Sequence, residues 1–282
     1  MGQVPVEKTD ILNKIESGIP LRYAIVGSGK LARHLKHYFL IKKLPLQLWS
    51  RNSNPDFNTR LKNDHLNKFD RLRETIKSVD IVCLALSDGS LEGFYNFNKQ
   101  ILEDKFVVHF SGALTIPDVY SAHPLMSFGN KLYDKATYES IPFITEKTHY
   151  PLSKVFPLLP NPSFAIDSAL KPLYHSYCVL AGNMSTILWQ EVFERFGTNL
   201  KLPKEVLIPY LLQIYRNLIE DPKEALTGPL QRNDLDTIHR NLVALNDDSL
   251  QQVYESFVSF KAKQLKEKSS LSHTQDNKNE NT

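Results

Sequence analysis

Short apolar runs, separated by longer amphipathic segments, constrain this chain most strongly. Runs of the length of a β-strand occur at residues 23–27, 46–50, 80–86, 106–112, 142–146 and 163–167. Runs that are apolar nearly throughout are typical of parallel strands buried on both faces and joined by crossover segments. The pattern predicts an α/β fold with a doubly wound sheet over residues 21–167.

Helical periodicity replaces the strand signals after Ala169. We expect one long helix over residues 171–196 and a second over 203–220, opened by Pro203 and kinked by Pro209. Two further helices are expected to begin after capping aspartates, Asp234 and Asp248. The tail lacks apolar anchors and is predicted to be disordered. The predicted organisation is an N-terminal extension (1–20), the α/β domain (21–167), an all-helical domain (168–264) and the tail (265–282).

The segment YAIVGSGKLARHL, residues 23–35, joins the first predicted strand to a helix through a turn with two glycines. In a dinucleotide-binding Rossmann turn, Gly27 permits the tight bend and Gly29 lets the backbone approach a pyrophosphate. Ala32, in place of a third glycine, allows the helix to pack closely on the strand. The unpaired amides and dipole of the helix N-terminus favour a phosphate there. The alternative is an ordinary tight turn.

A P-loop for nucleoside triphosphates is excluded, because Leu31 stands where Ser or Thr must hold magnesium and Ala24 stands at the first glycine. The second strand ends about twenty residues downstream, where an NAD site carries an acidic residue. Arg51 at that strand end favours the 2′-phosphate of NADP, although a solvated arginine is the alternative. The turn and the strand ends predict these NADP(H)-binding residues: Gly27, Ser28, Gly29, Lys30, Leu31, Ala32, Ser50, Arg51, Asn52, Ser87, Asp88 and Ser111.

The charge balance, the two cysteines and the lengths of the apolar runs limit the ligands and surroundings that the sequence suits. The chain has 282 residues, a formal net charge of +3, and 34 basic against 31 acidic residues, which predicts no polyanionic partner such as nucleic acid and is compatible with a small anionic substrate. Cys83 and Cys178 lie in apolar runs, and no Cys/His spacing suits a metal, so we predict neither disulfides nor a metal site. No signal peptide or apolar run of membrane-spanning length is seen. We expect a soluble, cytoplasmic protein.

The segments GSGKLA, LALSD, VVHFSGAL, AHPLMSF, LYHSYCVLAGN and LTGPLQRND resemble one family over nearly the whole ordered chain. These are Rossmann-like oxidoreductases with a C-terminal helical domain of unknown function, relatives of pyrroline-5-carboxylate and 6-phosphogluconate dehydrogenases. The chain is also similar to a divergent ketopantoate reductase type within that group. The resemblance implies that the glycine turn carries the cofactor and that the family positions are His123, His175, Asn183, Thr227, Gly228, Pro229 and Arg232.

One departure from the family pattern lies after Arg232, where Asn233 replaces the glycine of Arg-Gly-Asp. Asn tolerates a left-handed backbone better than most residues, so we expect the turn to survive. The better-known ketopantoate reductases use a helical lysine followed by an asparagine about four residues on, together with a glutamate. That pattern is not found, so their mechanism is not carried over.

Hydride transfer to a ketone leaves an alkoxide that needs a hydrogen-bond or proton donor. We predict Lys171, Asn183 and His123 as catalytic residues, with Lys171 or Asn183 at the reacting oxygen. A solvated Lys171 and an Asn183 in a buried polar network are the alternatives. His123 is expected on a loop, facing substrate or bracing the loop.

We predict His175, Thr227 and Arg232 as substrate-binding residues. The alternatives are a core or interface histidine at position 175 and an Arg232 that caps local carbonyls. An ideal helix separates His175 from Asn183 by roughly 12 Å, too far for both to reach one carbonyl. Tyr174 is predicted to be a packing residue.

The leading hypothesis is an NADPH-dependent reductase of a small 2-oxo acid. Its best candidate reaction is the reduction of 2-dehydropantoate (ketopantoate) to pantoate in pantothenate biosynthesis. The alternatives are an imine reductase of the pyrroline-5-carboxylate type and a non-catalytic dinucleotide sensor. The segment LIPYLLQIYRNL is apolar on more than one face, which predicts a homodimer through the helical domain.

Overall fold

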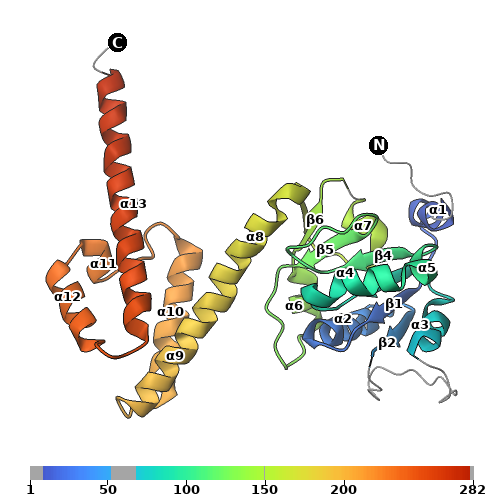
Figure 1. Ribbon diagram of the computed structural model, residues 1–282, viewed down its shortest axis with the longest axis horizontal. Coiled ribbons are helices and arrows are strands. Elements are labelled where there is room, and N and C mark those ends of the chain that lie inside the picture. The colour runs from blue at the N-terminus through green and yellow to red at the C-terminus, as the bar shows by residue number, and fades with distance from the viewer. Residues whose placement is uncertain (1–8, 52–67, 149, 280–282) are drawn as a thin grey trace. The chain divides into compact units, whose positions relative to one another are not determined.

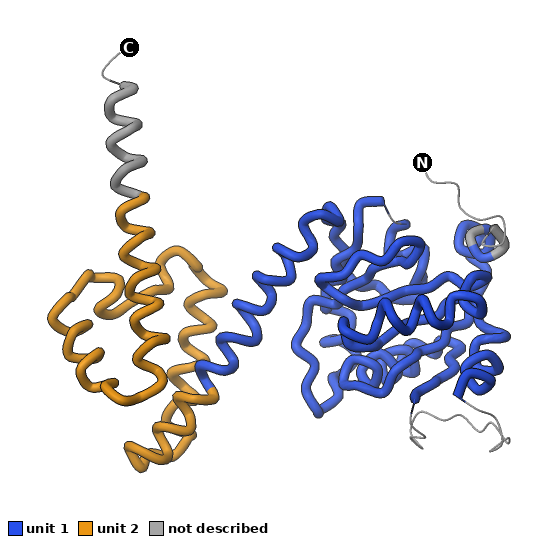
Figure 2. Tube along the Cα trace, in the orientation of Figure 1, with its two compact units in different colours: residues 1–189 blue, residues 190–282 orange. Residues whose placement is uncertain are grey.

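The computed structural model describes residues 9–51, 68–148 and 150–279, which belong to two compact units, Met1–Trp189 and Gln190–Thr282 (Figure 2). Within the described part of the first unit, seven strands form one sheet in the order β2-β1-β3-β4-β5-β6-β7 (Figure 1). The strands are β1 (Tyr23–Val26), β2 (Leu46–Trp49), β3 (Ile81–Leu84), β4 (Phe106–His109), β5 (Tyr120–Pro124), β6 (Phe143–Glu146) and β7 (Ser163–Ile166). The predicted α/β Rossmann-like fold with a helical C-terminal region is confirmed.

Strand β1 lies in the interior of the sheet and pairs in parallel with β2 on one side and β3 on the other. All four of its residues are buried. Tyr23 and Ile25 enter one hydrophobic cluster, while Ala24 and Val26 enter another. Because alternate side chains point to opposite faces of a strand, both faces of the sheet are covered at this position.

Helices on each face build these two clusters. The cluster around Tyr23 receives buried side chains from α1 (Thr9–Ser17), α2 (Lys30–Ile41), α6 (Lys135–Ser140) and α7 (Leu152–Val155). The cluster around Ala24 receives them from α3 (Lys68–Ile76), α4 (Asp88–Phe97) and α5 (Lys99–Leu102). This arrangement gives the first unit its doubly wound, three-layer architecture.

Strand β5 is a departure from the predicted pattern. Its sequence, YSAHP, contains small and polar residues and lacks the apolar run that marks the other strands. It pairs in parallel with β4 but antiparallel with β6, so the sheet is mixed rather than wholly parallel. The placement of His123 on a loop is therefore wrong, since His123 lies on β5 opposite Ile144. The two neighbouring strands supply the hydrogen bonds that this polar segment needs.

The N-terminal extension contributes to the first core through α1, where Ile11 and Ile15 are buried. Asp80, just before β3, accepts a hydrogen bond from Lys14 Nζ at 2.8 Å and another from the Arg22 backbone amide at 2.8 Å. Burial alone would raise the pKa of Asp80, but these hydrogen bonds outweigh it and hold the pKa below its usual value. An ion pair thus joins α1 to the sheet.

The long helix predicted at residue 171 consists of α8 (Lys171–Cys178), a π-helical turn (Val179–Met184) and α9 (Ser185–Thr198). The predicted boundary at residue 167 differs from the division by compactness, which follows Trp189. Contacts of α8 with the sheet, described below, explain why this helix groups with the first unit.

The second unit continues with a 3₁₀ turn (Lys204–Val206) and α10 (Leu207–Glu220). Pro209 lies in the first turn of α10, where its missing N–H would have no helical partner, so it costs the helix no hydrogen bond. Short α11 (Pro229–Arg232) and α12 (Leu235–Ala244) follow, and Asp234 caps α12 as predicted, accepting from the Thr237 amide. Helix α13 (Leu250–Asn279) extends into the segment predicted as a disordered tail.

Few side chains of the second unit are buried. Among its described residues only Leu207 and Ile238 are buried, whereas α10 exposes Ile208, Tyr210 and Leu212. Apolar surface of this extent on a short helical unit is typical of a site that another protein surface covers. None of the described helices combines the length and apolar character needed to cross a membrane.

Candidate functional site

The glycine turn lies between β1 and α2 at the carboxyl ends of the parallel strands. Gly27 has a φ of +135°, and a Cβ there would collide with the carbonyl oxygen of Ala85, just after β3. Only glycine therefore allows the turn to approach β3 so closely. A Cβ at Gly29 would meet no atom within 4 Å, so the space above this residue is open.

Helix α2 begins at this turn without a side-chain cap: Gly29 is the N-cap residue, and Ser28 and Lys30 beside it are exposed. Ala32 is fully buried against the sheet, as expected for a helix packed closely on its strand, and Leu31 is partly buried beside the same core. An uncapped helix N-terminus of this length leaves amide donors for an anion.

The strand-end residues differ in their surroundings. Ser50 is buried and Arg51 is exposed after β2, whereas Asn52 lies outside the described residues. Ser87 is the N-cap residue of α4, its hydroxyl lies 3.1 Å from that of Ser90, and exposed Asp88 begins the helix.

The hydroxyl of Ser111 accepts hydrogen bonds from the amides of Ala113 and Leu114. This side chain therefore shapes the turn after β4. The predicted cofactor contacts of all these strand-end residues stay predictions.

Two histidines and a tyrosine meet beside the end of β4. His123 Nδ1 lies 2.7 Å from the hydroxyl of Tyr174, and the rings of His123 and His175 are nearly perpendicular with centroids 6.0 Å apart. A Cβ at Gly112 would stand 2.7 Å from His175 Nδ1 and 3.1 Å from His123 Nε2. The absence of a side chain at Gly112 therefore makes the space that both imidazoles use.

Burial shifts the pKa values of His123 and Tyr174 so that both side chains are neutral at pH 7. Burial is the main cause that lowers the pKa of His123 to about 4, with help from His175 and Lys171, while Asp88 opposes the shift. His123 is therefore neutral at pH 7. Burial, together with a hydrogen bond to Cys178, raises the pKa of Tyr174, so its hydroxyl stays protonated.

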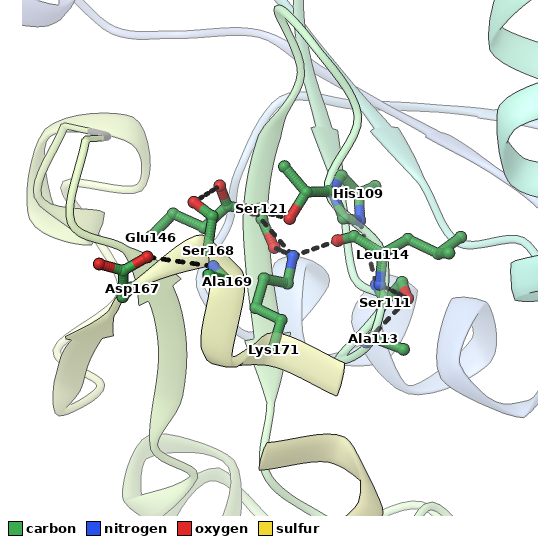
Figure 3. A network of polar contacts seen from close by, with 11 residues as sticks. His109, Ser111, Ala113, Leu114, Ser121, Glu146, Asp167, Ser168, Ala169 and Lys171 are labelled. Carbon is green, nitrogen blue, oxygen red and sulfur yellow. Dashed lines mark hydrogen bonds and ion pairs between the residues drawn. The ribbon is translucent and has the colours of Figure 1, made fainter. Parts of the chain in front are cut away.

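Lys171, the first residue of α8, occupies a buried polar network (Figure 3). Its ammonium donates to Glu146 Oε1 at 2.8 Å, to Ser121 Oγ at 2.6 Å and to the Leu114 carbonyl oxygen. Burial lowers the pKa of Lys171, and the ion pair with Glu146 acts against that shift. The alternative of a solvated Lys171 is wrong, because the residue is only 3% exposed.

Asn183 lies in the π-helical turn and is exposed, so a buried polar network around it is not found. The turn also widens the helix between His175 and Asn183, so ideal α-helical spacing does not apply to this pair. The predicted catalytic role of Asn183 stays a prediction.

Thr227 and Arg232 belong to the second unit, Thr227 just before α11 and Arg232 at its end, and both are exposed. Asn233 has φ 54° and ψ 41°, which confirms the expected left-handed turn. The substrate-binding role of Thr227 and Arg232 stays a prediction.

Sequence reasoning missed Tyr174 and Glu146. The sequence predicts Tyr174 to be a packing residue, because a tyrosine in an apolar helix carries no signal of a polar partner far away in the chain. Glu146 ends the apolar run PFITE, and nothing local indicates its pairing with a lysine 25 residues later. No group of three or more His, Cys, Asp or Glu residues suited to a metal ion occurs among the described residues.

Residues 145–259 match the sequence model of a family described as a domain of unknown function, DUF2520. A search of curated proteins finds no match. Among solved structures, a presumed NADP oxidoreductase from Bacteroides fragilis is similar with a TM-score of 0.65 and 20% identity, over 86% of this chain and 97% of that one.

Two further structures share the fold at lower identity. Pyrroline carboxylate reductase from Plasmodium falciparum, with NADP bound, has a TM-score of 0.51 and 14% identity, covering 86% of this chain and 96% of that one. Imine reductase from Streptomyces aurantiacus has a TM-score of 0.56 and 9% identity, covering 86% and 93%. At these identities the likeness establishes the Rossmann-like reductase fold.

The packing of both imidazoles on Gly112 leads to a prediction for Gly112→Ala. The added methyl group must displace His175 or His123, so we expect a loss of about 1–3 kcal/mol in the free energy of unfolding. Gly93→Ala in α4 is the control, because open space surrounds Gly93 and alanine favours a helix interior. Denaturant unfolding and histidine NMR signals measure the effect. Unchanged stability and unchanged histidine signals in Gly112→Ala would contradict this packing.

Proposed function

We propose that this protein is an NADPH-dependent reductase that delivers hydride to a small carbonyl substrate. The observation that carries the proposal is the Tyr174–His123 pair beside Gly112, at the sheet edge where the glycine turn also lies. Parallel strands β1, β3, β4 and β5 end at one edge, which is where open α/β sheets bind their ligands.

The residues of the turn fit a dinucleotide. Gly29 leaves open space, the amides of α2 lack a side-chain cap, and exposed Arg51 follows β2 with no carboxylate in the adjoining residues Ser50 and Asn52. Gly27 to Ala32 would hold the pyrophosphate and Arg51 the 2′-phosphate. NADPH supplies the hydride when bound. The fold shared with a reductase that has NADP bound supports this assignment.

The Tyr174–His123 pair suits proton donation to the alkoxide that hydride addition creates. When Nδ1 of neutral His123 carries the imidazole proton, it donates to the Tyr174 oxygen, and the tyrosine proton turns from its hydrogen bond with Cys178 to the substrate oxygen. Proton transfer then leaves a phenolate, which the Nδ1–H group stabilises until water returns the proton. Lys171 is less suited to this role, because its ammonium already has three acceptors.

The finer assignment that we propose is a 2-oxo acid, with 2-dehydropantoate as the first candidate. A protonated tyrosine is matched to an alkoxide, which is a much stronger base than tyrosinate. A cyclic imine is the second candidate, because the carboxylate of Asp88 acts on His123 and favours a cationic substrate. The shared fold of pyrroline carboxylate and imine reductases supports the second candidate.

The protein acts, in this proposal, as a homodimer formed through its helical region. The second unit buries only Leu207 and Ile238 among its described residues and leaves apolar side chains of α10 exposed. Arg216 and Glu220 are the only charged residues of α10. A second copy offers the same apolar helix, and self-complementary apolar surfaces are typical of twofold dimers.

Hydride transfer tests the reaction. NADPH oxidation by the purified protein is expected with 2-oxo acids, 2-dehydropantoate among them, and Tyr174→Phe should lower turnover by about 10²-fold or more with unchanged NADPH affinity. Tyr177→Phe is the matched control, since Tyr177 is 60% exposed on the same helix. Reduction of cyclic imines alone would favour the second candidate. Tight NADPH binding with no reduction of either class would instead indicate the non-catalytic sensor.

The preference of the protein for NADPH over NADH tests the proposed contact between Arg51 and the 2′-phosphate. NADPH is expected to bind more tightly than NADH, and Arg51→Ala should narrow that difference by about 1–3 kcal/mol, because a charge-assisted contact to the 2′-phosphate is lost. Lys147→Ala, an exposed cation after β6, serves as the control. Calorimetric titration of both cofactors measures the difference. Equal affinity of the unsubstituted protein for NADH and NADPH would contradict the assignment.

The mass of the protein in solution tests the proposed homodimer. Light scattering at micromolar concentration is expected to give twice the mass of the chain, and Leu212→Glu on α10 should shift the protein to monomer, because a charge enters an apolar interface. Lys223→Glu, an exposed position between α10 and α11, should leave the mass unchanged. A monomeric unsubstituted protein would exclude the dimer.

A further inference from the structure

A buried ion pair joins the start of α8 to the sheet. The side chains of Lys171 and Glu146 are 4% and 3% exposed, and their charged atoms lie 2.8 Å apart. Glu146 ends β6, and Ser121, which also receives a hydrogen bond from Lys171, is the second residue of β5. Two neighbouring strands therefore hold the first residue of one helix (Figure 3).

The network leaves the Lys171 ammonium without a donor for a substrate. An ammonium has three N–H bonds, and Glu146, Ser121 and the Leu114 carbonyl oxygen are three acceptors.

Both carboxylate oxygens of Glu146 also accept hydrogen bonds inside the protein. Its second oxygen accepts from Ser168 at 2.6 Å, and Oε1 also accepts from Thr115 at 3.3 Å. Both charges are compensated inside the protein, as a buried ion pair requires. A reaction at Lys171 Nζ would first have to break one of these contacts.

Lys171 stands one helical turn before the residues of the candidate site. Tyr174 and His175 follow by three and four positions, so they lie on the same side of α8 as Lys171. Tyr174 contacts His123 on β5, and His175 packs against Gly112. A shift of α8 by one residue would rotate this face by about 100° and break both contacts.

We propose that Lys171 is a positioning residue: its ion pair with Glu146 sets the rotation and height of α8 and so brings Tyr174 to His123 and His175 to Gly112. This inference rests on the proposed reductase function. It assigns Lys171 to the geometry of the site rather than to proton donation. The carboxylate of Glu146 is then as necessary as the lysine, although it lies outside the reacting cluster.

The test compares four variants: Lys171→Met, Glu146→Gln, the double variant with both changes, and Lys147→Met as the control at an exposed neighbouring lysine. The first readout needs no cofactor: the nuclear Overhauser contact between the rings of Tyr174 and His123, whose centroids are 5.6 Å apart. Thermal midpoint, NADPH affinity and single-turnover hydride transfer are measured on the same preparations.

Each single variant leaves an unmatched partner in the buried network, so we expect both to lose the ring contact and at least about 10²-fold of the hydride rate, with NADPH affinity retained. Glu146→Gln keeps the ammonium, so its loss of rate separates positioning from chemistry at Nζ. The double variant removes both charges and keeps an amide at position 146. It is expected to regain the ring contact and to come within about tenfold of the unsubstituted rate.

A folded double variant that keeps the ring contact but reacts as slowly as Lys171→Met would overturn the proposal, because the ammonium itself would then act on substrate. A full hydride rate in Glu146→Gln would overturn it as well. If the unsubstituted protein reduces no substrate, the proposed function fails. The ring contact still decides the positioning role: its loss in Glu146→Gln and recovery in the double variant support that role, and its persistence in Glu146→Gln overturns it.

Discussion

Strand β1 is hydrogen-bonded to a parallel strand on each side, and the arrangement of the first unit depends on this pairing. The register Val26 to Leu84 brings the ends of β1 and β3 together, so the chain leaving β1 must turn directly against the backbone at Ala85. Only a glycine at position 27 fits there. The turn then starts α2 with no side-chain cap at its N-terminus, an arrangement that suits an anion.

The same edge of the sheet concentrates polar groups whose charges are largely suppressed. His123 is neutral because it is buried, and the charge of Lys171 is compensated by Glu146. Asp88 remains as an exposed carboxylate that acts on both His123 and Lys171. Ionisation of buried polar groups is costly unless hydrogen bonds or opposite charges compensate it.

The two units differ in how far their apolar side chains are buried. In the first, helices on both faces of the sheet bury all residues of β1 and β3, whereas β7 at the edge of the sheet has no buried residue. In the second, helical periodicity is strong, but the helices leave side chains such as Ile208, Leu212 and Phe257 exposed. The hydrogen bonds of a helix are local, so a helix can form wherever its own sequence favours it. Burial of its apolar face, in contrast, needs contact with another element or another chain. Secondary structure was therefore more predictable there than packing.

The sequence by itself determined the strands with apolar runs, the glycine turn, the caps of α12 and the left-handed conformation at Asn233, because each depends on a few neighbouring residues. It did not determine β5, whose polar residues form a strand only because β4 and β6 flank them. It also did not determine which of the candidate residues meet. Tyr174 reaches His123 across 51 positions, and Lys171 reaches Glu146 across 25. Only the tertiary structure decided these pairs, because the free energy of a buried polar group depends on the partner that the fold brings to it.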